Sequence, residues 1–267
     1  NIVDHAVANP GLSSLVAALT DGGNTTFTDL LSNEEELFTV FAPGNDAFSA
    51  FTNPNSNDIN AILANHVVMG AAAFRSDLTS TYYTTEAEFA TDENLSLYVN
   101  IDDGVTLNGT SSVVMADIVA SNGVIHTVDA VIDLPTVVTF ATADPTFSTL
   151  VQALTELTPS TDFVSVLSAQ DGAGSDPFTV FAPTNDAFAA LASIPGEADL
   201  TPILQHHVVA GANVRSGDLS DGATATTLEG DMITINLPGT GDNIADITDG
   251  AGNTGIGIDA VDVQAIN

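Results

Sequence analysis

The sequence predicts an α+β fold in two consecutive domains, residues 1–136 and 137–267. The eleven residues FTVFAPGNDAF, beginning at Phe38, return with one change as FTVFAPTNDAF, beginning at Phe178. In each half, apolar residues at helical spacing come first and alternating polar and apolar residues follow. Helices that precede a run of strands favour α+β over a parallel βαβ sheet, and each half is long enough to bury its own core.

The order of parts is the same in both halves. IVDHAVANPGLSSLVAAL, from Ile2, matches VVTFATADPTFSTLVQAL, from Val137; each is an apolar stretch, a turn at Asn-Pro or Asp-Pro, and a helical pattern. A short helical segment, the eleven-residue motif and another helical segment follow. Next comes NHVVMG from Asn65 in the first half, or HHVVAG from His206 in the second. This repetition predicts two copies of one domain.

Strands are expected downstream of these helices. The segments LSLYVNI, VTLNG, SVVMADIVAS and GVIHTVDAVI read as half-buried strands separated by Asp, Asn and Gly turns. VDVQAIN, from Val261, aligns with ADIVASN, from Ala116, but the sequence stops at Asn267 without a counterpart of residues 123–132. Either the natural chain continues or another chain supplies this strand, because an open edge leaves backbone groups unpaired. The first explanation is the simpler one.

The repeated motif is predicted to turn a strand into a helix. Phe-Thr-Val-Phe-Ala has the composition of a buried strand, and Pro43 and Pro183 end it because proline has no N–H to donate. Thr184 is placed to cap the following helix, whereas Gly44 is a weaker cap in the first copy. The Ala-Phe pair at the end of each motif is expected to pack the helix on the core; the pairs are Ala47 with Phe48 and Ala187 with Phe188.

These motifs resemble those of the fasciclin-type domain. The resemblance rests on T-V-F-A-P-x-N-D-A-F, on H-V-V-x-G about 20 residues later, and on NGVIHTVDAVI from Asn122. It implies a wedge of two β-sheets with about seven strands and helices at one side, and it implies no catalytic residues. It also implies a secreted or surface-anchored protein that acts in cell adhesion, matrix contact, or biofilm or symbiotic attachment. The motif residues are Thr39, Phe41, Pro43, Asn45, Asp46, Phe48, His66, Arg75, His126, Thr179, Phe181, Pro183, Asn185, Asp186, Phe188, His207 and Arg215.

The histidines of interest are two at equivalent positions of the repeat and one in the terminal motif of the first half. His66 and His207 occupy equivalent positions, and His126 lies in the terminal motif. They are candidates for a ligand or proton-switch role, but we predict buried histidines paired to the backbone. His206 and His207 are adjacent, so on a strand they would point to opposite faces and could not bind one ion together.

Arg75 and Arg215 are the only strong cations and fall at the same place in the two repeats, beside Asp77 and Asp218. We predict that each guanidinium is partly buried and holds a carboxylate or loop carbonyls, for which its planar fork suits it. Replacement of Arg75 by Gln should then lower the melting temperature. The alternative is that both are inherited surface residues.

The composition is strongly acidic, with 35 acidic residues, two arginines, no lysine and no cysteine. Such a chain repels nucleic acid and anionic lipid, because both bind through Lys and Arg. A solubility coat suited to salty surroundings is the favoured interpretation, and a prokaryote from saline water the expected source. Calcium-dependent association is the alternative; Asp92, Asp102 and Asp103 are weak candidates without the spacing of a dedicated loop.

No catalytic signature recurs in both halves, so we expect no enzyme and no cofactor. GAGNTG, from Gly250, fits a dinucleotide pattern but precedes a strand-like segment, so we interpret it as a turn. No apolar run approaches a membrane span and the residues that begin at Asn1 have no basic-plus-apolar leader pattern, so any signal peptide or anchor is expected outside this sequence. The first functional hypothesis is an extracellular adhesion module whose partners are surface proteins, glycans or itself. The alternatives are a filament subunit joined through the open edge near Asn267, and a module that holds a small apolar ligand between helix and sheet.

Overall fold

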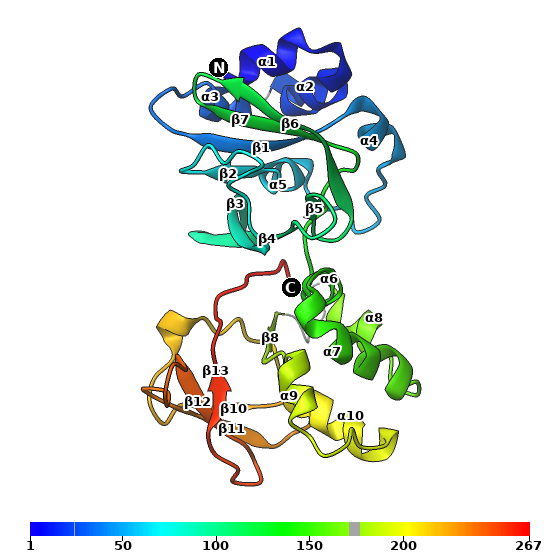
Figure 1. Cartoon of the computed structure of the whole chain (residues 1–267), viewed down its shortest axis with the longest axis vertical. Helices are drawn as coiled ribbons and strands as arrows, with labels where there is room; N and C mark the ends of the chain where they lie inside the picture. The colour runs from blue at the N-terminus through cyan, green and yellow to red at the C-terminus, as the bar shows by residue number, and fades with distance from the viewer. Residues whose placement is uncertain (24, 171–176) are drawn as a thin grey trace. The chain divides into compact units, whose positions relative to one another are not determined.

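The computed structural model describes residues 1–23, 25–170 and 177–267 (Figure 1). The chain separates into two compact units, the first Asn1–Pro135 with Gln264–Ile266 and the second Thr136–Val263 with Asn267. In each unit, helices come first and strands dominate the later part. The predicted α+β class is therefore confirmed.

The helices of the first unit are short, and those that precede residue 32 lie together in the N-terminal part of the unit (Figure 1). They are α1 (Ile2–Ala8), η1 (Pro10–Leu12), α2 (Ser13–Leu19), η2 (Asp21–Gly23), α3 (Thr26–Leu31), α4 (Asn45–Ala50) and α5 (Ile59–Ala64). Asn9 ends α1 and caps η1. Its side chain accepts a hydrogen bond from Gly11 N–H at 3.0 Å, and Pro10 follows it at the first helical position of η1.

The described residues of the first unit form a seven-stranded sheet in the order β2-β1-β7-β6-β5-β4-β3. They are β1 (Phe38–Pro43), β2 (Val67–Met69), β3 (Thr81–Ala90), β4 (Glu93–Asn100), β5 (Thr106–Leu107), β6 (Ser111–Ala120) and β7 (Gly123–Val128). All neighbours are antiparallel except β1 and β7, which run parallel from Phe38 opposite Gly123 to Pro43 opposite Val128. The four strands predicted from alternation are confirmed as β4 to β7, whereas β3 was not predicted.

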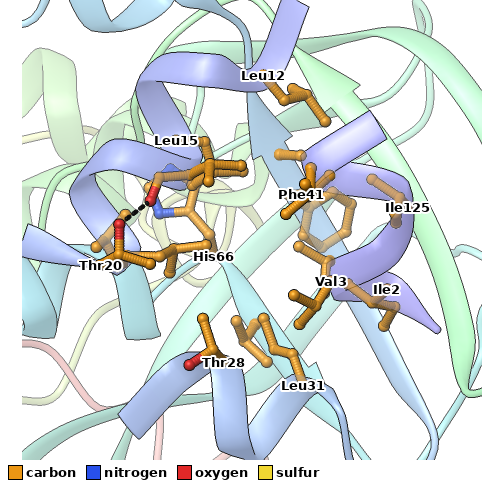
Figure 2. A pocket seen from close by; sticks show the side chains of 18 residues that line it. Ile2, Val3, Leu12, Leu15, Thr20, Thr28, Leu31, Phe41, His66 and Ile125 are labelled. Carbon is orange, nitrogen blue, oxygen red and sulfur yellow. Dashed lines mark hydrogen bonds between the residues drawn. The ribbon is translucent and has the colours of Figure 1, made fainter. Parts of the chain in front are cut away.

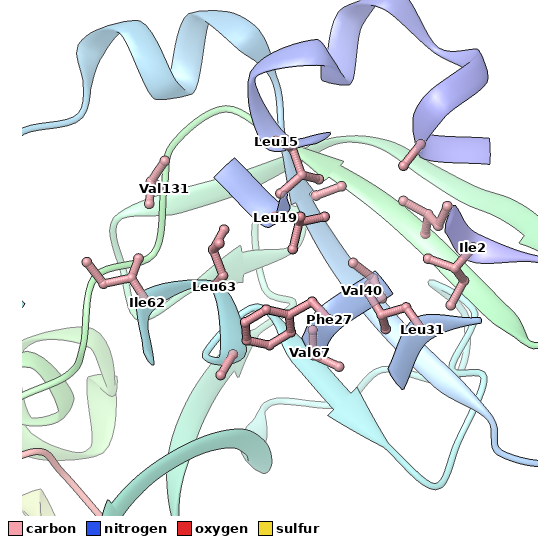
Figure 3. Packing of buried hydrophobic residues seen from close by; sticks show 14 of the residues in the cluster. Ile2, Leu15, Leu19, Phe27, Leu31, Val40, Ile62, Leu63, Val67 and Val131 are labelled. Atoms are coloured by element: carbon pink, nitrogen blue, oxygen red, sulfur yellow. The ribbon is translucent and has the colours of Figure 1, made fainter. Parts of the chain in front are cut away.

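Alternation along β1 divides the first unit into two cores. Val40 and Ala42 face the helices and join a cluster with Leu15, Leu31 and Leu63, part of which Figure 3 shows. Phe41 belongs to a second cluster, together with Leu97, Val99, Leu107 and Val128. Because both faces of β1 are covered, all six of its residues are buried.

The second unit begins with the same helical plan. Its helices are α6 (Val137–Ala143), η3 (Pro145–Phe147), α7 (Ser148–Gln152), the π-helical turn η4 (Ala153–Leu157), α8 (Phe163–Leu167), α9 (Asn185–Ala189), α10 (Glu197–His206) and η5 (Ser216–Asp218). Thr136 caps α6 by accepting a hydrogen bond from Thr139 N–H at 3.2 Å.

The described strands of the second unit form two separate sheets, β8-β9 and β10-β11-β12-β13. They are β8 (Phe178–Val180), β9 (Val208–Ala210), β10 (Thr224–Thr226), β11 (Met232–Asn236), β12 (Ala245–Thr248) and β13 (Ile256–Ile258). The segment that aligns with β6, from Val261 to Asn267, is not a strand. GAGNTG lies in the connection between β12 and β13, as predicted.

The predicted strand-to-helix corner is confirmed in both units. β1 ends at Pro43 and α4 begins at Asn45, and in the second copy Thr184 Oγ1 accepts a hydrogen bond from Ala187 N–H at 3.3 Å at the start of α9. One detail of the expected packing was wrong. Ala47 is buried, but Ala187 is exposed, so Phe188 alone anchors the second helix on its core.

Among the described residues, no single helix combines the length and apolar composition needed to cross a membrane. Helices 2–8 and 10–19 meet that test only as a pair, and they are bent by 98° at the break between them.

Candidate functional site

Asn45 and Asn185, the asparagines of the repeated motif, tie each corner to the N-terminal helices. The Asn45 amide donates to Pro10 O at 2.9 Å, and its Oδ1 accepts from Ser14 N–H at 2.9 Å. Asn185 makes the same two bonds, to Pro145 O and from Thr149 N–H, also at 2.9 Å. A side-chain amide can satisfy a donor and an acceptor of the backbone at once. The motif asparagine therefore joins two segments of its own domain.

Thr39 and Thr179 act in the same way on a later loop. Thr39 Oγ1 donates to Ala71 O at 2.8 Å and accepts from Ala73 N–H at 2.9 Å. Thr179 Oγ1 donates to Ala212 O at 2.8 Å and accepts from Val214 N–H at 2.9 Å. These hydroxyls are thus occupied by backbone groups of the loops that precede Arg75 and Arg215.

His66 is buried and both of its ring nitrogens are bonded to the backbone. Nδ1–H donates to Ile62 O at 2.7 Å, and Nε2 accepts from Ile132 N–H at 2.9 Å. Burial lowers the pKa of the imidazole to about 4, against the opposing effect of the bond to Ile62. The neutral ring is required because a protonated Nε2 would point its proton at the Ile132 N–H.

His126 and His207 also have backbone partners. His126 Nε2–H donates to Ala73 O at 2.9 Å, while its Nδ1 accepts from Asp117 N–H at 3.3 Å. His207 Nδ1–H donates to Ile203 O at 2.8 Å, and burial lowers the pKa of this half-buried ring. Backbone pairing of the motif histidines is therefore confirmed. His206 is the last residue of α10 and His207 follows it, so the pair does not lie on a strand.

The prediction for the arginines was wrong in the first unit. Arg75 is exposed, and its guanidinium makes no ion pair with a described residue. Its backbone N–H instead donates to Asp117 Oδ1 at 2.7 Å. In the second unit, where Arg215 is half-buried and likewise makes no ion pair with a described residue, the N–H of Ser216 donates to Asp262 Oδ1 at 2.7 Å.

The two aspartates that receive these bonds were not predicted. Asp117 and Asp262 both have positive φ, 63° and 59°, and both hold the turn that contains the arginine. The only signal in the sequence was the Asp shared by ADIVASN and VDVQAIN, which gives no hint of its partner. Each turn is thus held by a carboxylate that accepts a hydrogen bond from a backbone N–H group. The predicted contact, in which the arginine side chain holds a carboxylate, is not the one that holds the turn.

The weak calcium candidates do not come together. Asp92 lies in the turn before β4, and Asp102 and Asp103 lie in the turn after it, so the strand separates them. Within residues 1–23, 25–170 and 177–267, no group of three or more His, Cys, Asp or Glu side chains is arranged to hold a metal ion.

Asn122 and Asn267 are equivalent buried asparagines that sequence reasoning used only for alignment. The Asn122 amide donates to Leu31 O and Asn33 O at 2.8 and 2.9 Å, and its Oδ1 accepts from Ile2 N–H at 2.9 Å. Asn267 makes the matching bonds to the backbone of residues 167 and 169 at 2.8 and 3.0 Å and accepts from that of residue 137 at 3.0 Å. The two units therefore match up to the residue that precedes β7.

β8 differs from β1 at the place where β7 would lie. Among the described strands, β8 pairs only with β9, and only Phe178 of its three residues is buried. Phe181, equivalent to the buried Phe41, is half-buried. In the first unit, one edge of β1 pairs in parallel with β7. The corresponding edge of β8 has no partner strand among the described residues.

An apolar cavity of about 50 Å³ lies in the first unit, between its N-terminal helices and the sheet (Figure 2). α1 contributes Val3 and α2 contributes Leu15, while Phe41, His66 and Ile125 line the side towards the sheet. Thr20 and Thr28 are the other polar residues in its wall.

The fold and these contacts define a two-domain α+β protein in which the repeated polar residues hold the backbone of their own domain. The sequence profile of the fasciclin domain matches residues 10–135 and again residues 145–255. The chain therefore belongs to the fasciclin domain family, with two consecutive copies.

Similar proteins come from distant organisms. Protein sll1483 of Synechocystis sp. is 40% identical over 114 residues, which are 38% of this chain and 55% of that protein. Human periostin is 28% identical over 244 residues, 88% of this chain and 27% of periostin. A domain pair from the insect cell adhesion molecule Fasciclin I has the same fold, with a TM-score of 0.56 and 20% identity over 97% of this chain and 94% of that one. The chain spans about half or less of the length of these two relatives.

Proposed function

We propose that this chain is a non-catalytic adhesion module of a secreted or cell-surface protein, and that it acts through surface contact by its two fasciclin domains. The observation that supports this most is the match of the fasciclin profile to both halves. The structural neighbour that aligns over both domains is described as coming from a cell adhesion molecule. Surface proteins, glycans or a second copy are the proposed partners, in biofilm or matrix attachment.

The chemistry of the repeated residues supports a non-catalytic role. The side chains of Thr39, Asn45 and His66 are all bonded to backbone groups. A general base or nucleophile needs an atom that is available to substrate. These residues offer none, and the same holds for Thr179 and Asn185 in the second unit.

Bead aggregation tests adhesion directly. Beads coated with the full chain should clump or attach to cells, and the assay is repeated with calcium and then with chelator. Beads that carry the Gly123→Ala variant provide a control of equal charge in which the first domain is disrupted. Clumping by the native chain alone supports the proposal; equal dispersal of both kinds of bead contradicts it.

A filament subunit is the second candidate, and the half-buried β8 is the observation that favours it. Addition of a strand in the position that β7 holds in the first unit would supply hydrogen bonds to this edge and cover Phe181. Light scattering and electron microscopy of the full chain should then show ordered polymers that shorten when a peptide with the sequence of residues 123–132 is added in excess. A monomer at all concentrations would contradict this candidate.

A further inference from the structure

The cavity under the N-terminal helices of the first unit has walls made almost wholly of aliphatic side chains. Its lining residues come from α1, α2, α3 and the sheet; they are Ile2, Val3, Ala6, Val7, Leu12, Leu15, Val16, Leu19, Thr20, Thr28, Leu31, Val40, Phe41, Ala42, Leu63, His66, Val67 and Ile125. Among these, Val7 and Thr20 are exposed, whereas Phe41 and Ile125 are buried. The lining thus includes residues of the helical surface as well as residues of the sheet (Figure 2).

The polar side chains in this wall already have hydrogen-bond partners in the backbone. Thr20 Oγ1 donates to Val16 O at 2.9 Å, and Thr28 Oγ1 donates to Thr25 O at 2.9 Å. Both nitrogens of His66 are bonded to backbone groups. A buried water needs two to four polar partners, and an apolar cavity without them stays dry and takes up apolar ligands. The volume of about 50 Å³ exceeds the space for one water.

Size and charge narrow the class of ligand. Cavities that accept benzene are about 150 Å³, so this one suits a thinner occupant. Asp21 and Asp29 each follow a lining threonine by one residue, and the unit has only one arginine, the exposed Arg75. An anionic head group would find acidic neighbours at the helical surface and no paired cation to hold it.

We propose that this cavity is a binding site for a small uncharged apolar ligand with a narrow, unbranched alkyl end. The alkyl end lies among Leu15, Val16 and Ile125, and any polar group remains outside at Val7 and Thr20. This site is separate from the adhesive role and from the open edge of β8. The second unit provides an internal comparison, because its described residues contain no counterpart of β7 and hence of Ile125.

The probes are xenon and 1-pentanol, with pentanoate as the charged counterpart of the alcohol. Methyl-labelled full chain is titrated by NMR, and saturable shifts are expected at the methyl groups of Leu15, Leu63 and Ile125 in the native protein. Pentanoate should bind at least about tenfold more weakly, because its carboxylate must approach an acidic surface. Shifts that do not saturate, or equal binding of pentanol and pentanoate, would overturn the proposal.

Matched variants locate the site. Val16 and Val151 are both half-buried and occupy equivalent helical positions, but only Val16 lines the cavity. Val16→Phe should weaken xenon and pentanol binding by at least about tenfold, whereas Val151→Phe should leave it unchanged. If Val16→Phe does not fold, Ala6→Val takes its place and should weaken binding, because Ala6 also lines the cavity. Ala141→Val, at the equivalent position of the second unit, should leave binding unchanged. Retained binding in the folded Val16→Phe or Ala6→Val chain would overturn the assignment.

Discussion

The same eleven residues, with one change, make a fully buried six-residue strand in the first unit and a half-buried three-residue strand in the second. The local features are shared: the corner follows the proline, and Asn45 and Asn185 make the same two bonds to the backbone. What differs is the neighbouring strand. β7 pairs with one edge of β1, and no described strand pairs with the corresponding edge of β8. Local sequence sets the corner, and the partner strand sets the length and burial of the strand.

The largest effect is expected where β7 meets β1. Gly123 has φ 154°, and a Cβ there would collide with the backbone of Phe38. Gly123→Ala should therefore destabilise the first unit by at least about 4 kcal/mol, leaving the second unit unchanged. The measurement is denaturant unfolding of the full chain with probes for each unit. Gly44→Ala is the control, since the nearest atoms to its Cβ lie 3.9 Å away; a first unit that tolerates both changes equally would refute the dependence on β7.

The second largest effect is expected from acid, which should lower the stability of the first unit more than that of the second. The pKa of His66 is about 4 in the folded protein and 6.5 in the reference state, so the unfolded chain takes up the proton first as the pH falls. Stability of the first unit should decline between pH 6.5 and pH 4, by about 3 kcal/mol from this group, and no further below pH 4. The measurement is the free energy of unfolding of each unit at several pH values.

Carboxylates titrate in the same range, so variants must isolate the histidine. His66→Gln should flatten the slope of the first unit above pH 4, whatever its effect at pH 7. His207 is only half-buried and lacks the Ile132 partner, so His207→Gln should change the slope of the second unit less. Equal slopes before and after the His66 change would contradict the prediction.

The motif asparagines should be equivalent, which tests the shared part of the comparison. Asn45→Ala and Asn185→Ala each remove one donated and one accepted bond to the backbone, so each should cost about 1 to 2 kcal/mol in its own unit. Thermal unfolding of the two variants gives the sizes. A large difference between them would show that β7 also strengthens the corner.

Salt should raise the stability of both units by a similar, smaller amount. The acidic residues divide almost equally between residues 1–136 and 137–267, with 18 and 17, and each part has one arginine. An increase from about 0.1 M to about 1 M NaCl shortens the Debye length from roughly 10 to 3 Å and relieves this repulsion. We expect about 1 kcal/mol per unit from such screening. Melting temperatures that do not change with the NaCl concentration would contradict the solubility-coat interpretation.

The smallest effect is expected at Arg75. Because its guanidinium is exposed and makes no ion pair with a described residue, Arg75→Gln should change stability by less than about 0.5 kcal/mol. Asp117→Ala is the matched change, since it removes the acceptor of the Arg75 N–H and should cost more. A clear drop in melting temperature with Arg75→Gln would restore the original arginine hypothesis.

The sequence predicted features that depend on neighbouring residues. Pro43 and Thr184 act within a few residues of themselves, so the corner and its cap could be placed in advance. β3 was not predicted, because shifts of register between Thr84 and Ala90 break its alternation. The cavity and the bonds of Asn122 depend on segments far apart in sequence, such as Ile2 with Asn122. The prediction of a partly buried Arg75 failed because rarity in the composition says nothing about exposure.

The parallel pairing of β1 with β7 also bears on how the protein is made. On the ribosome, Phe38–Pro43 emerges early, and β2 can pair with one of its edges as soon as Val67–Met69 follows. Its other edge has no partner until Gly123–Val128 has been synthesised. Closing a sheet across so long a stretch is slow, and it leaves an apolar strand open during most of the domain's translation. We therefore expect the nascent first domain to depend on chaperones until β7 emerges.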